Sequence, residues 1–501
     1  MITFFQTSFK ILRLLLLVFS LHWLFVSVQE LFILAEWKSW TIWFLIFFFL
    51  CIIAWRKHLY SFLMKHKFAI MAAVIIVQLL MLGAAEQLIR RDAGVVFSGA
   101  FKTITENQIS SYLTRNPNNL PLFLYERFFY SAFGFYGLWV MQLLNMVYTD
   151  LTAWILYKGM KRHFDQAAAD AVFSFYLLLI GFSPYFYSMY TDILPLPLIA
   201  LQIFLALDIF KTREGLRLKK QSVYLGLLSA LAVLVRPTTF ILVLAFLLIL
   251  FFKNQWKKFA VILSCIGLAF GLSYGAVKIA INHQKVVPLV KGEGLAKGPL
   301  LFIDLGLTDT GHNQEDMKRG LLQYVDPKKR NDYNNGMFKT ENVIKDIQRR
   351  WKHYTWYTFL GHLYQKQSLT VAEGTLGWSY QDLENEKTPI ISPLYKYTKH
   401  NRLAQFIRTY FLSIDKKEYQ YYAYSKQVVW IVMALGLVAV FFYYKASDPM
   451  HFLSLAVFGG LLFLLIFEGG KTRYLIQFLP QILILSALGL TQYRQGRRGL
   501  P

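Results

Sequence analysis

The hydrophobic positions of this chain form long runs that repeat from one end to the other. Most runs have about the 20 residues that an α-helix needs to cross a bilayer, and polar or basic clusters separate them. We therefore predict about a dozen membrane-spanning helices. Their expected ranges are 11–34, 40–55, 68–89, 133–157, 168–187, 194–210, 222–236, 238–252, 259–280, 427–444, 451–467 and 474–491.

The run from 222 to 252 is interrupted by Arg236 and Pro237. Proline removes a backbone donor and breaks or kinks a helix. Two interpretations remain: a tight hairpin with Arg236 at the outer surface, or one kinked helix. Basic clusters on both flanks favour the hairpin.

Two segments are too polar and too long to be simple connections. Residues 90–132 contain several charges and two prolines, and their stretch 100–113 has the spacing of an interfacial helix. Residues 282–425 have the size of a soluble domain. The Gly-rich opening 291–311 suggests turns and short strands, and 341–365 suggests an amphipathic helix.

These patterns predict a polytopic α-helical membrane protein with about 12 transmembrane helices and an extracytoplasmic domain that is mixed α/β or mainly α. The expected divisions are an extra N-terminal two-span hairpin at 1–67, a transmembrane core at 68–281 with its outer loop 90–132, the extracytoplasmic domain at 282–425, and C-terminal spans with a basic cytoplasmic tail at 426–501.

Composition and charge support a membrane protein and indicate its orientation. Hydrophobic residues make up 56% and charged residues 16% of the 501 positions, which excludes an ordinary soluble domain. The net charge of +24 comes mostly from basic residues at the span ends, so it indicates topology and not nucleic-acid binding. The asymmetry places both termini in the cytoplasm and both long segments outside the membrane.

The absence of glycosylation sequons favours a bacterial plasma membrane, whereas the cysteines do not indicate a redox compartment. Cys51 and Cys265 lie within apolar runs, so they form no disulfide framework. The sequence has no N-x-[ST] acceptor for glycosylation.

Candidate chemistry collects at the outer boundary of the predicted spans. Asp92 follows the third span, Asp192 the fifth and Arg236 the seventh, and Glu468 to Tyr474 join the last two. A carboxylate among cations beside apolar walls suits a reaction on an anionic lipid-linked substrate. For any single residue, a role as an interface anchor is an equally simple interpretation.

Searches for other motifs return little. His353 and His362 are nine positions apart, which is not the spacing of metal ligands on one helical face, so no metal site is assigned. Gly292 and Gly294 lack the strand and helix of a nucleotide-binding fingerprint.

In order along the chain, the short motifs resemble the GT-C superfamily of integral membrane glycosyltransferases, in the branch of protein mannosyltransferases and aminoarabinose transferases. The motifs are Asp92, Asn116 to Leu122, Ser183-Pro184, Tyr190-Thr191-Asp192, Leu234 to Thr238 and Lys471 to Leu475. The resemblance covers most of 68–491. Ala93 stands where the family often has a second acid, and the two spans before residue 68 are an addition.

The resemblance implies a polyprenyl-phosphate sugar donor in the lipid bilayer, a cell-envelope glycan acceptor such as a cell wall polysaccharide, and inverting transfer at an extracytoplasmic active site. It assigns Asp92 as the catalytic base. The expected donor phosphate-binding residues are Lys471, Arg473, Arg91 and Arg236. The expected supporting acid or acceptor-binding residues are Asp192, Glu468, Tyr474, Asn118 and Asn119. The resemblance leaves a divalent metal open and names no other cofactor.

Two alternatives stay open. A lipid-linked polysaccharide polymerase or ligase would use similar residues but a diphosphate-linked oligosaccharide. A transporter or flippase would carry internal repeats and mid-membrane charges. In the external domain, Trp351, Trp356, Tyr357 and Trp378 are either sugar-stacking platforms or ordinary core and interface residues.

Overall fold

The computed structural model describes residues 2–36, 39–89, 91–378 and 390–498. Some side chains near both termini, in α2 and at position 91 lie outside the described part.

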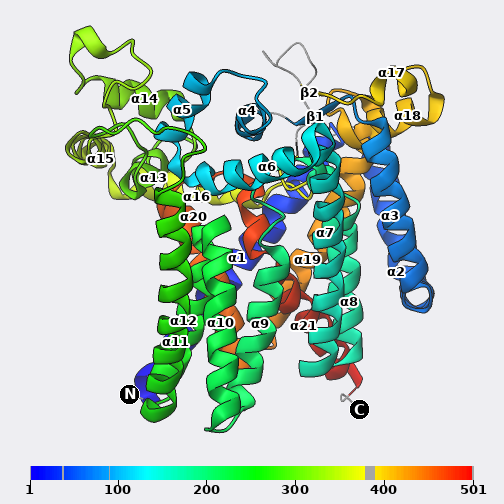
Figure 1. Cartoon of the computed structure of the whole chain (residues 1–501). Helices are drawn as coiled ribbons and strands as arrows, with labels where there is room; N and C mark the ends of the chain where they lie inside the picture. Colours follow the sequence, from blue (N-terminus) through cyan, green and yellow to red (C-terminus); the bar gives the residue numbers. More distant parts are fainter. Residues whose placement is uncertain (1, 37–38, 90, 379–389, 499–501) are drawn as a thin grey trace.

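Each predicted span coincides with a helix of the main bundle (Figure 1). These helices are α1 (Ile2–Leu34), α2 (Ser39–Lys65), α3 (Lys67–Ala84), α7 (Gly137–His163), α8 (Gln166–Tyr176), continued by the π-helix η3 (Leu177–Gly181), α9 (Leu196–Lys211), α10 (Leu216–Val235), α11 (Phe240–Phe252), α12 (Trp256–Asn282), α19 (Lys417–Phe442), α20 (Asp448–Ile466) and α21 (Leu479–Arg498). Within the described residues, seven helical segments are long and apolar enough to cross a membrane by length and composition.

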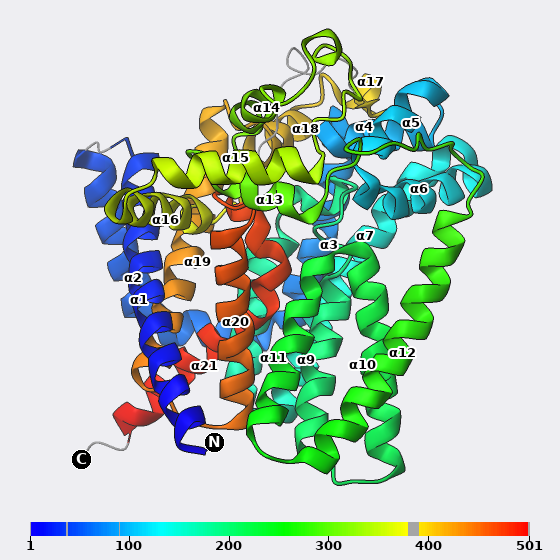
Figure 2. The ribbon, with the colours of Figure 1, turned by 90° about the vertical axis from the view of Figure 1, so that its left-hand side faces the viewer.

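The remaining elements gather at one end of the bundle, which we call the loop-rich end (Figures 1 and 2). They are β1 (Gln87–Ile89), α4 (Arg91–Ala100), α5 (Glu106–Arg115), η1 (Pro117–Asn119), α6 (Leu120–Phe133), η2 (Gly134–Tyr136), η4 (Pro184–Tyr187), η5 (Pro237–Thr239), α13 (Pro299–Gly306), α14 (Gln314–Leu322), η6 (Pro327–Lys329), α15 (Thr340–His353), α16 (Trp356–Val371), β2 (Ile390–Ile391), α17 (Tyr395–Thr398), α18 (Arg402–Ile407), η8 (Arg408–Leu412) and η9 (Thr472–Phe478). Helices α6, α15 and α16 run across this end, and α1 begins and α21 ends at the opposite end.

The break between α10 and α11 follows from local chemistry. A residue before proline avoids the helical region, and Arg236 has an extended backbone (φ −149°, ψ 104°) ahead of Pro237. Helix α10 therefore ends at Val235, and the hairpin is the interpretation that the structure supports.

Three local expectations need correction. The opening 291–311 contains turns and α13 but no strand among its residues; the described strands, β1 and β2, pair antiparallel elsewhere. The single helix expected over 341–365 is two helices, because Thr355 is extended and caps α16 through Thr358. The interfacial helix expected at 100–113 is α5, which begins after its own cap at Thr105. The region is thus mainly α.

Helix α21 is the central helix of the bundle. It packs against α8, α9, α19 and α20, and its residues 479–488 are buried almost completely. A helix that is apolar on every side is buried among other helices. The last helix of the chain is therefore the one that holds η9, directly before it, in a fixed position.

Helices α13, α14 and α15 form a small separate core that includes Leu301, Met317 and Val343. Beside it, Arg350 contacts Asp304 at 3.0 Å and Asp346 at 2.9 Å. Burial raises the pKa of Asp304 to about 7, the neighbouring Asp346 adds to the rise, and Arg350 opposes it.

We expect this region to be more stable at pH 5 than at pH 7.5. A raised carboxyl pKa gives stability that is complete below the ordinary value near 3.8 and is lost as the pH rises through about 7. Asp304→Asn should therefore reduce the loss of stability between pH 5 and pH 7.5. The measurement is the urea concentration at which half of the protein becomes open to proteolysis within 299–350, taken at each pH. The exposed Asp332→Asn is the control; equal pH slopes in the two variants would contradict the assignment.

Candidate active site

Three connections at the loop-rich end bring one carboxylate and two guanidinium groups together. They are the turn before α9, the break between α10 and α11, and η9. Asp192, from the turn before α9, contacts Arg473 Nε through Oδ2 at 2.8 Å and Arg236 through Oδ1 at 3.2 Å. Asp192 is 2% exposed, whereas the side chains of Arg473 and Arg236 are 32% and 15% exposed. Two cations thus face the surrounding space while the acid that anchors them is covered.

Hydrogen bonds also join these three connections to one another. Arg236 donates to Thr191 Oγ1 at 2.8 Å and to Gln477 Oε1 at 3.2 Å, and Thr238 donates to the same Gln477 oxygen. Arg473 and Gln477 both come from η9, so this one short helix supplies a contact to Asp192 and another to Arg236. These contacts hold Arg236 and Arg473 in fixed positions before any ligand arrives.

Prolines explain why the chain turns beside Asp192. Pro184 begins η4, and Pro195 and Pro197 stand at the start of α9. Proline is tolerated in the first turn of a helix and disfavoured in its interior. The apolar stretch 168–210 is therefore divided into two helices, and the polar pair Thr191 and Asp192 lies in the connection.

Tyr190 links this cluster to Asp92. The Arg473 guanidinium lies over the Tyr190 ring, 4.8 Å from its centroid. Burial raises the pKa of Tyr190 to about 12; the charges of Asp92 and Asp192 add to the rise, and those of Arg473 and Arg236 oppose it. All four charges are thus close enough to act on one phenol.

Asp92 occupies the first turn of α4, and its residue is exposed. Its charge also adds to the burial that raises the pKa of Tyr112. The Tyr112 hydroxyl accepts a hydrogen bond of 2.9 Å from Asn119 Nδ2. Asp92 therefore stands at an accessible position whose neighbours come from α5 and η1, while Asp192 is enclosed between arginines.

Lys297 is a further cation that sequence reasoning missed. Its backbone N–H donates to the Arg115 carbonyl at 3.0 Å, which ties the Gly-rich loop to the end of α5. Burial lowers the pKa of its ammonium group, while the charges of Asp92 and Glu468 oppose this shift. A single lysine in a Gly-rich stretch gives no sequence signal, because only the fold brings it near Asp92.

Glu468 lies in the loop between α20 and η9 and accepts a hydrogen bond from the Tyr474 hydroxyl. The backbone amides of the two glycines in this loop are already hydrogen-bonded within the protein. Gly469 N–H donates to the Gly311 carbonyl, and Gly470 N–H donates to Thr370 Oγ1. Gly470 has φ +70°, and an added Cβ would lie 2.1 Å from the Thr310 carbonyl oxygen. The loop is thus closely packed. Burial lowers the pKa of His312, and the nearby charge of Lys471 lowers it further.

Lys366 fastens this loop from α16. Its ammonium group donates to the carbonyls of Gly306 at 3.0 Å, Leu465 at 2.9 Å and Phe467 at 2.5 Å. The carbonyls belong to the ends of α13 and α20, where backbone acceptors lack partners within the helix.

We expect Lys366→Met to lower stability by about 3 kcal/mol, because three buried acceptors lose a charged donor. The thermal midpoint of the purified protein measures the loss. Lys352→Met, an exposed lysine of α15, is the matched control. A Lys366→Met midpoint equal to that of the control would show that the contacts add nothing.

The other predicted residues have distinct places. Asn118 is exposed and donates to Asn119 at 3.4 Å. Arg91 begins α4, but its side chain lies outside the described residues. Trp378 is 6% exposed and contacts the rings of Tyr185 and Tyr187, so it belongs to the core. Trp351, Trp356 and Tyr357 are exposed on α15 and α16.

An apolar cavity of about 550 Å³ lies along α4, the helix that begins beside Asp92. Its walls come from α4, the turn before α7 and β2, and they include Phe97, Tyr136, Trp139 and Ile391. Among the described residues, no group of three or more His, Cys, Asp or Glu side chains is placed to hold a metal ion.

The helical bundle and its apolar spans define a polytopic α-helical membrane protein. The chain belongs to the family described as conserved hypothetical integral membrane protein, whose family model matches residues 2–493.

No curated protein matches the chain. Two similar solved structures are ArnT from Cupriavidus metallidurans bound to undecaprenyl phosphate and ArnT from the same organism in the apo state. The first is 11% identical, covers 87% of this chain and 81% of that chain, and has a TM-score of 0.34. The second is 11% identical, covers 85% and 78%, and has a TM-score of 0.32. Because TM-scores this low do not establish a common fold, the function is inferred below from this chain's own residues.

Proposed function

We propose that this protein is a GT-C type glycosyltransferase, which transfers a sugar from a polyprenyl-phosphate donor to a hydroxyl group of a cell-envelope glycan. One observation carries the proposal: Asp192 holds the guanidinium groups of Arg473 and Arg236 together, and Arg473 lies over the ring of Tyr190, whose pKa the nearby charge of Asp92 helps to raise. An accessible carboxylate facing fixed cations is what deprotonation of a hydroxyl and departure of a phosphate require.

In the proposed reaction, Asp92 accepts the proton of the acceptor hydroxyl. The acceptor oxygen bonds to the anomeric carbon from the side opposite the phosphate, the bond from that carbon to the phosphate oxygen breaks, and the configuration inverts. Polyprenyl phosphate leaves with the electron pair. Arg473, Arg236 and Lys297 stabilise the negative charge that develops on it.

The remaining residues support these steps. Asp192 holds both arginines in place, and Asn119 positions Tyr112 beside Asp92. Lys471 and Glu468, from the loop before η9, are proposed as further contacts of the donor and the acceptor. The prenyl chain of the donor stays in the bilayer, and the apolar cavity beside the second half of α4 offers it a wall at the loop-rich end. We place this site on the extracytoplasmic face of a bacterial plasma membrane, as the basic-residue asymmetry indicates.

The proposal is tested with purified protein in lipid nanodiscs and defined donors. A polyprenyl-phosphate monosaccharide should be consumed in the presence of a wall glycan, and polyprenyl phosphate should be released in equal amount. Consumption of a diphosphate-linked oligosaccharide instead would identify a polymerase or ligase. Movement of intact donor lipid across the bilayer without any bond cleavage would identify a flippase.

A further inference from the structure

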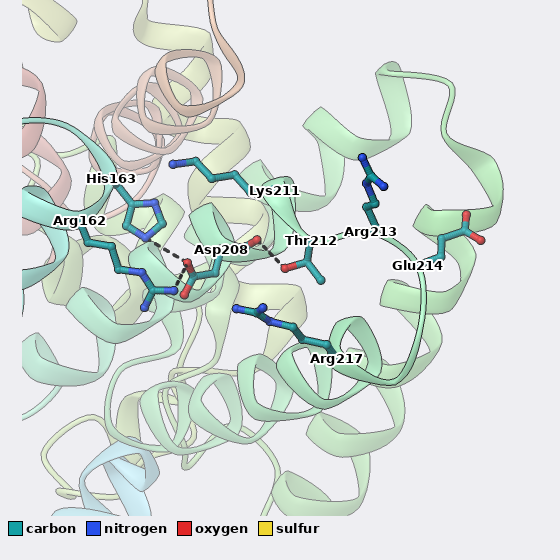
Figure 3. Close-up of a pocket in the computed structure, with 8 residues that line it drawn as sticks. All are labelled: Arg162, His163, Asp208, Lys211, Thr212, Arg213, Glu214 and Arg217. Carbon is teal, nitrogen blue, oxygen red and sulfur yellow. Dashed lines mark hydrogen bonds and ion pairs between the residues drawn. The ribbon is translucent and has the colours of Figure 1, made fainter.

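The opposite end of the bundle carries a basic pocket that the proposed reaction does not use. It has a volume of about 580 Å³ and lies between the end of α7, the end of α9 and the start of α10 (Figure 3). Its walls contain four basic side chains and two carboxylates, from Arg162, Lys211, Arg213, Arg217, Asp208 and Glu214. The pocket therefore has an excess of positive charge at the face that the basic-residue asymmetry predicts to be cytoplasmic.

The carboxylate of Asp208, in the wall of this pocket, already has two partners within the protein. Asp208 contacts Arg162 at 2.8 Å and His163 at 3.2 Å. Figure 3 shows Arg162 and Arg217 approaching Asp208 from two sides. Since Asp208 has its own partners, it does not cancel the charge of Lys211 and Arg217, which make no ion pair with the described residues.

A second observation indicates a ligand. The His163 side chain is 3% exposed and lines the pocket, yet its Nδ1 has no hydrogen-bond partner among the described residues. His163 Nε2 carries its proton toward the Asp208 carboxylate, so Nδ1 of the neutral ring is an acceptor. A buried polar atom normally has a partner, so this unpaired acceptor at a cavity wall indicates an absent donor, such as a water or a hydroxyl of a headgroup. In addition, no described side chain caps the N-terminus of α10, whose backbone amides favour an anion.

Exposed apolar side chains lie beside the pocket and further along α10, with Lys219 and Lys220 between them. From Leu216, next to Arg217, exposed side chains follow one face of α10 at helical spacing: Leu216, Val223, Tyr224, Leu227 and Leu231. A ligand with a headgroup in the pocket would therefore have a track for an acyl chain along α10. A free anion, which has no apolar part, would gain nothing from this apolar face.

We propose that this pocket binds the phosphodiester headgroup of an anionic membrane lipid, with Lys211, Arg217 and His163 as its contacts. Basic pockets between membrane helices at this face suit such headgroups. The loop between α9 and α10 lies at the end of the bundle opposite α4, which contains Asp92, so the pocket does not depend on the proposed function (Figures 1 and 2).

The test is a titration of the full chain in neutral detergent with phosphatidylglycerol, followed by native mass spectrometry. The double variant Lys211→Gln/Arg217→Gln should weaken the tightest lipid site about tenfold, which corresponds to about 1.4 kcal/mol. The matched control is Lys219→Gln/Lys445→Gln, which removes the same charge from two exposed lysines outside the pocket and should leave this site unchanged.

Further titrations distinguish a lipid headgroup from free phosphate as the bound anion. Phosphatidylcholine, which has no net charge, should bind the wild-type chain more weakly than phosphatidylglycerol. Inorganic phosphate at about 10 mM should not displace the lipid, since without acyl chains the charged contacts alone bind only weakly. Displacement by phosphate, equal binding of the two lipids, or equal weakening in both double variants would each overturn the proposal.

Discussion

Asp92→Asn is expected to reduce sugar transfer by about 10²- to 10⁴-fold while the protein still folds. An amide cannot accept the proton of the acceptor hydroxyl, and general-base catalysis contributes a factor of that size. Folding should be retained because Asp92 is exposed in the first turn of α4 and asparagine keeps its shape. Single-turnover rates with saturating donor measure the effect directly.

The matched control for this experiment is Asp332→Asn, an exposed acid of the same end of the molecule. It should transfer sugar at the wild-type rate. Donor binding should be unchanged in Asp92→Asn, since the carboxylate acts on the acceptor. Near wild-type turnover in Asp92→Asn would remove Asp92 from the mechanism.

Arg473→Gln is expected to lower kcat by about 10²- to 10³-fold and to raise the donor concentration needed for half-saturation. A fixed donor aimed at developing charge is commonly worth that much. The variant also removes one of the two arginines that neutralise the buried Asp192, so part of the loss could come from destabilisation.

The double variant Asp192→Asn/Arg473→Gln separates the two causes. It removes the buried acid together with its partner, so its thermal midpoint should recover toward wild type, whereas its turnover should not. If turnover recovered with stability, Arg473 would be a structural residue and the phosphate contact would have to be assigned to Arg236 or Lys297.

Much of the bundle could be predicted from sequence because length and apolarity alone define a spanning helix. The break at Arg236 was also accessible, since it depends on the proline that follows. Asp192 and Arg473 could be placed at the same depth, but their contact could not be predicted. It requires η9 and the turn before α9 to meet across 281 positions of the chain.

Other features gave no signal because their cause is tertiary. Lys366 and Lys426 look like ordinary surface lysines in sequence, yet both are buried and donate to helix-end or π-helix carbonyls. Lys297 also gave no signal, because only the fold brings it near Asp92. The start of α16 at Thr355 has a local cause, the cap contacts with Thr358, but threonine also occurs inside helices, so the sequence alone does not define it as a start.

The position of Arg473 has a consequence for biosynthesis. Arg473 lies 281 positions after Asp192, so a ribosome must synthesise α9 to α20 before this guanidinium can meet the carboxylate. Under the proposed function, a nascent chain that has not reached η9 would hold Asp92 without Arg473 and would not cleave lipid-linked sugar prematurely. Competence would arise only after α20 has been inserted and η9 has followed it.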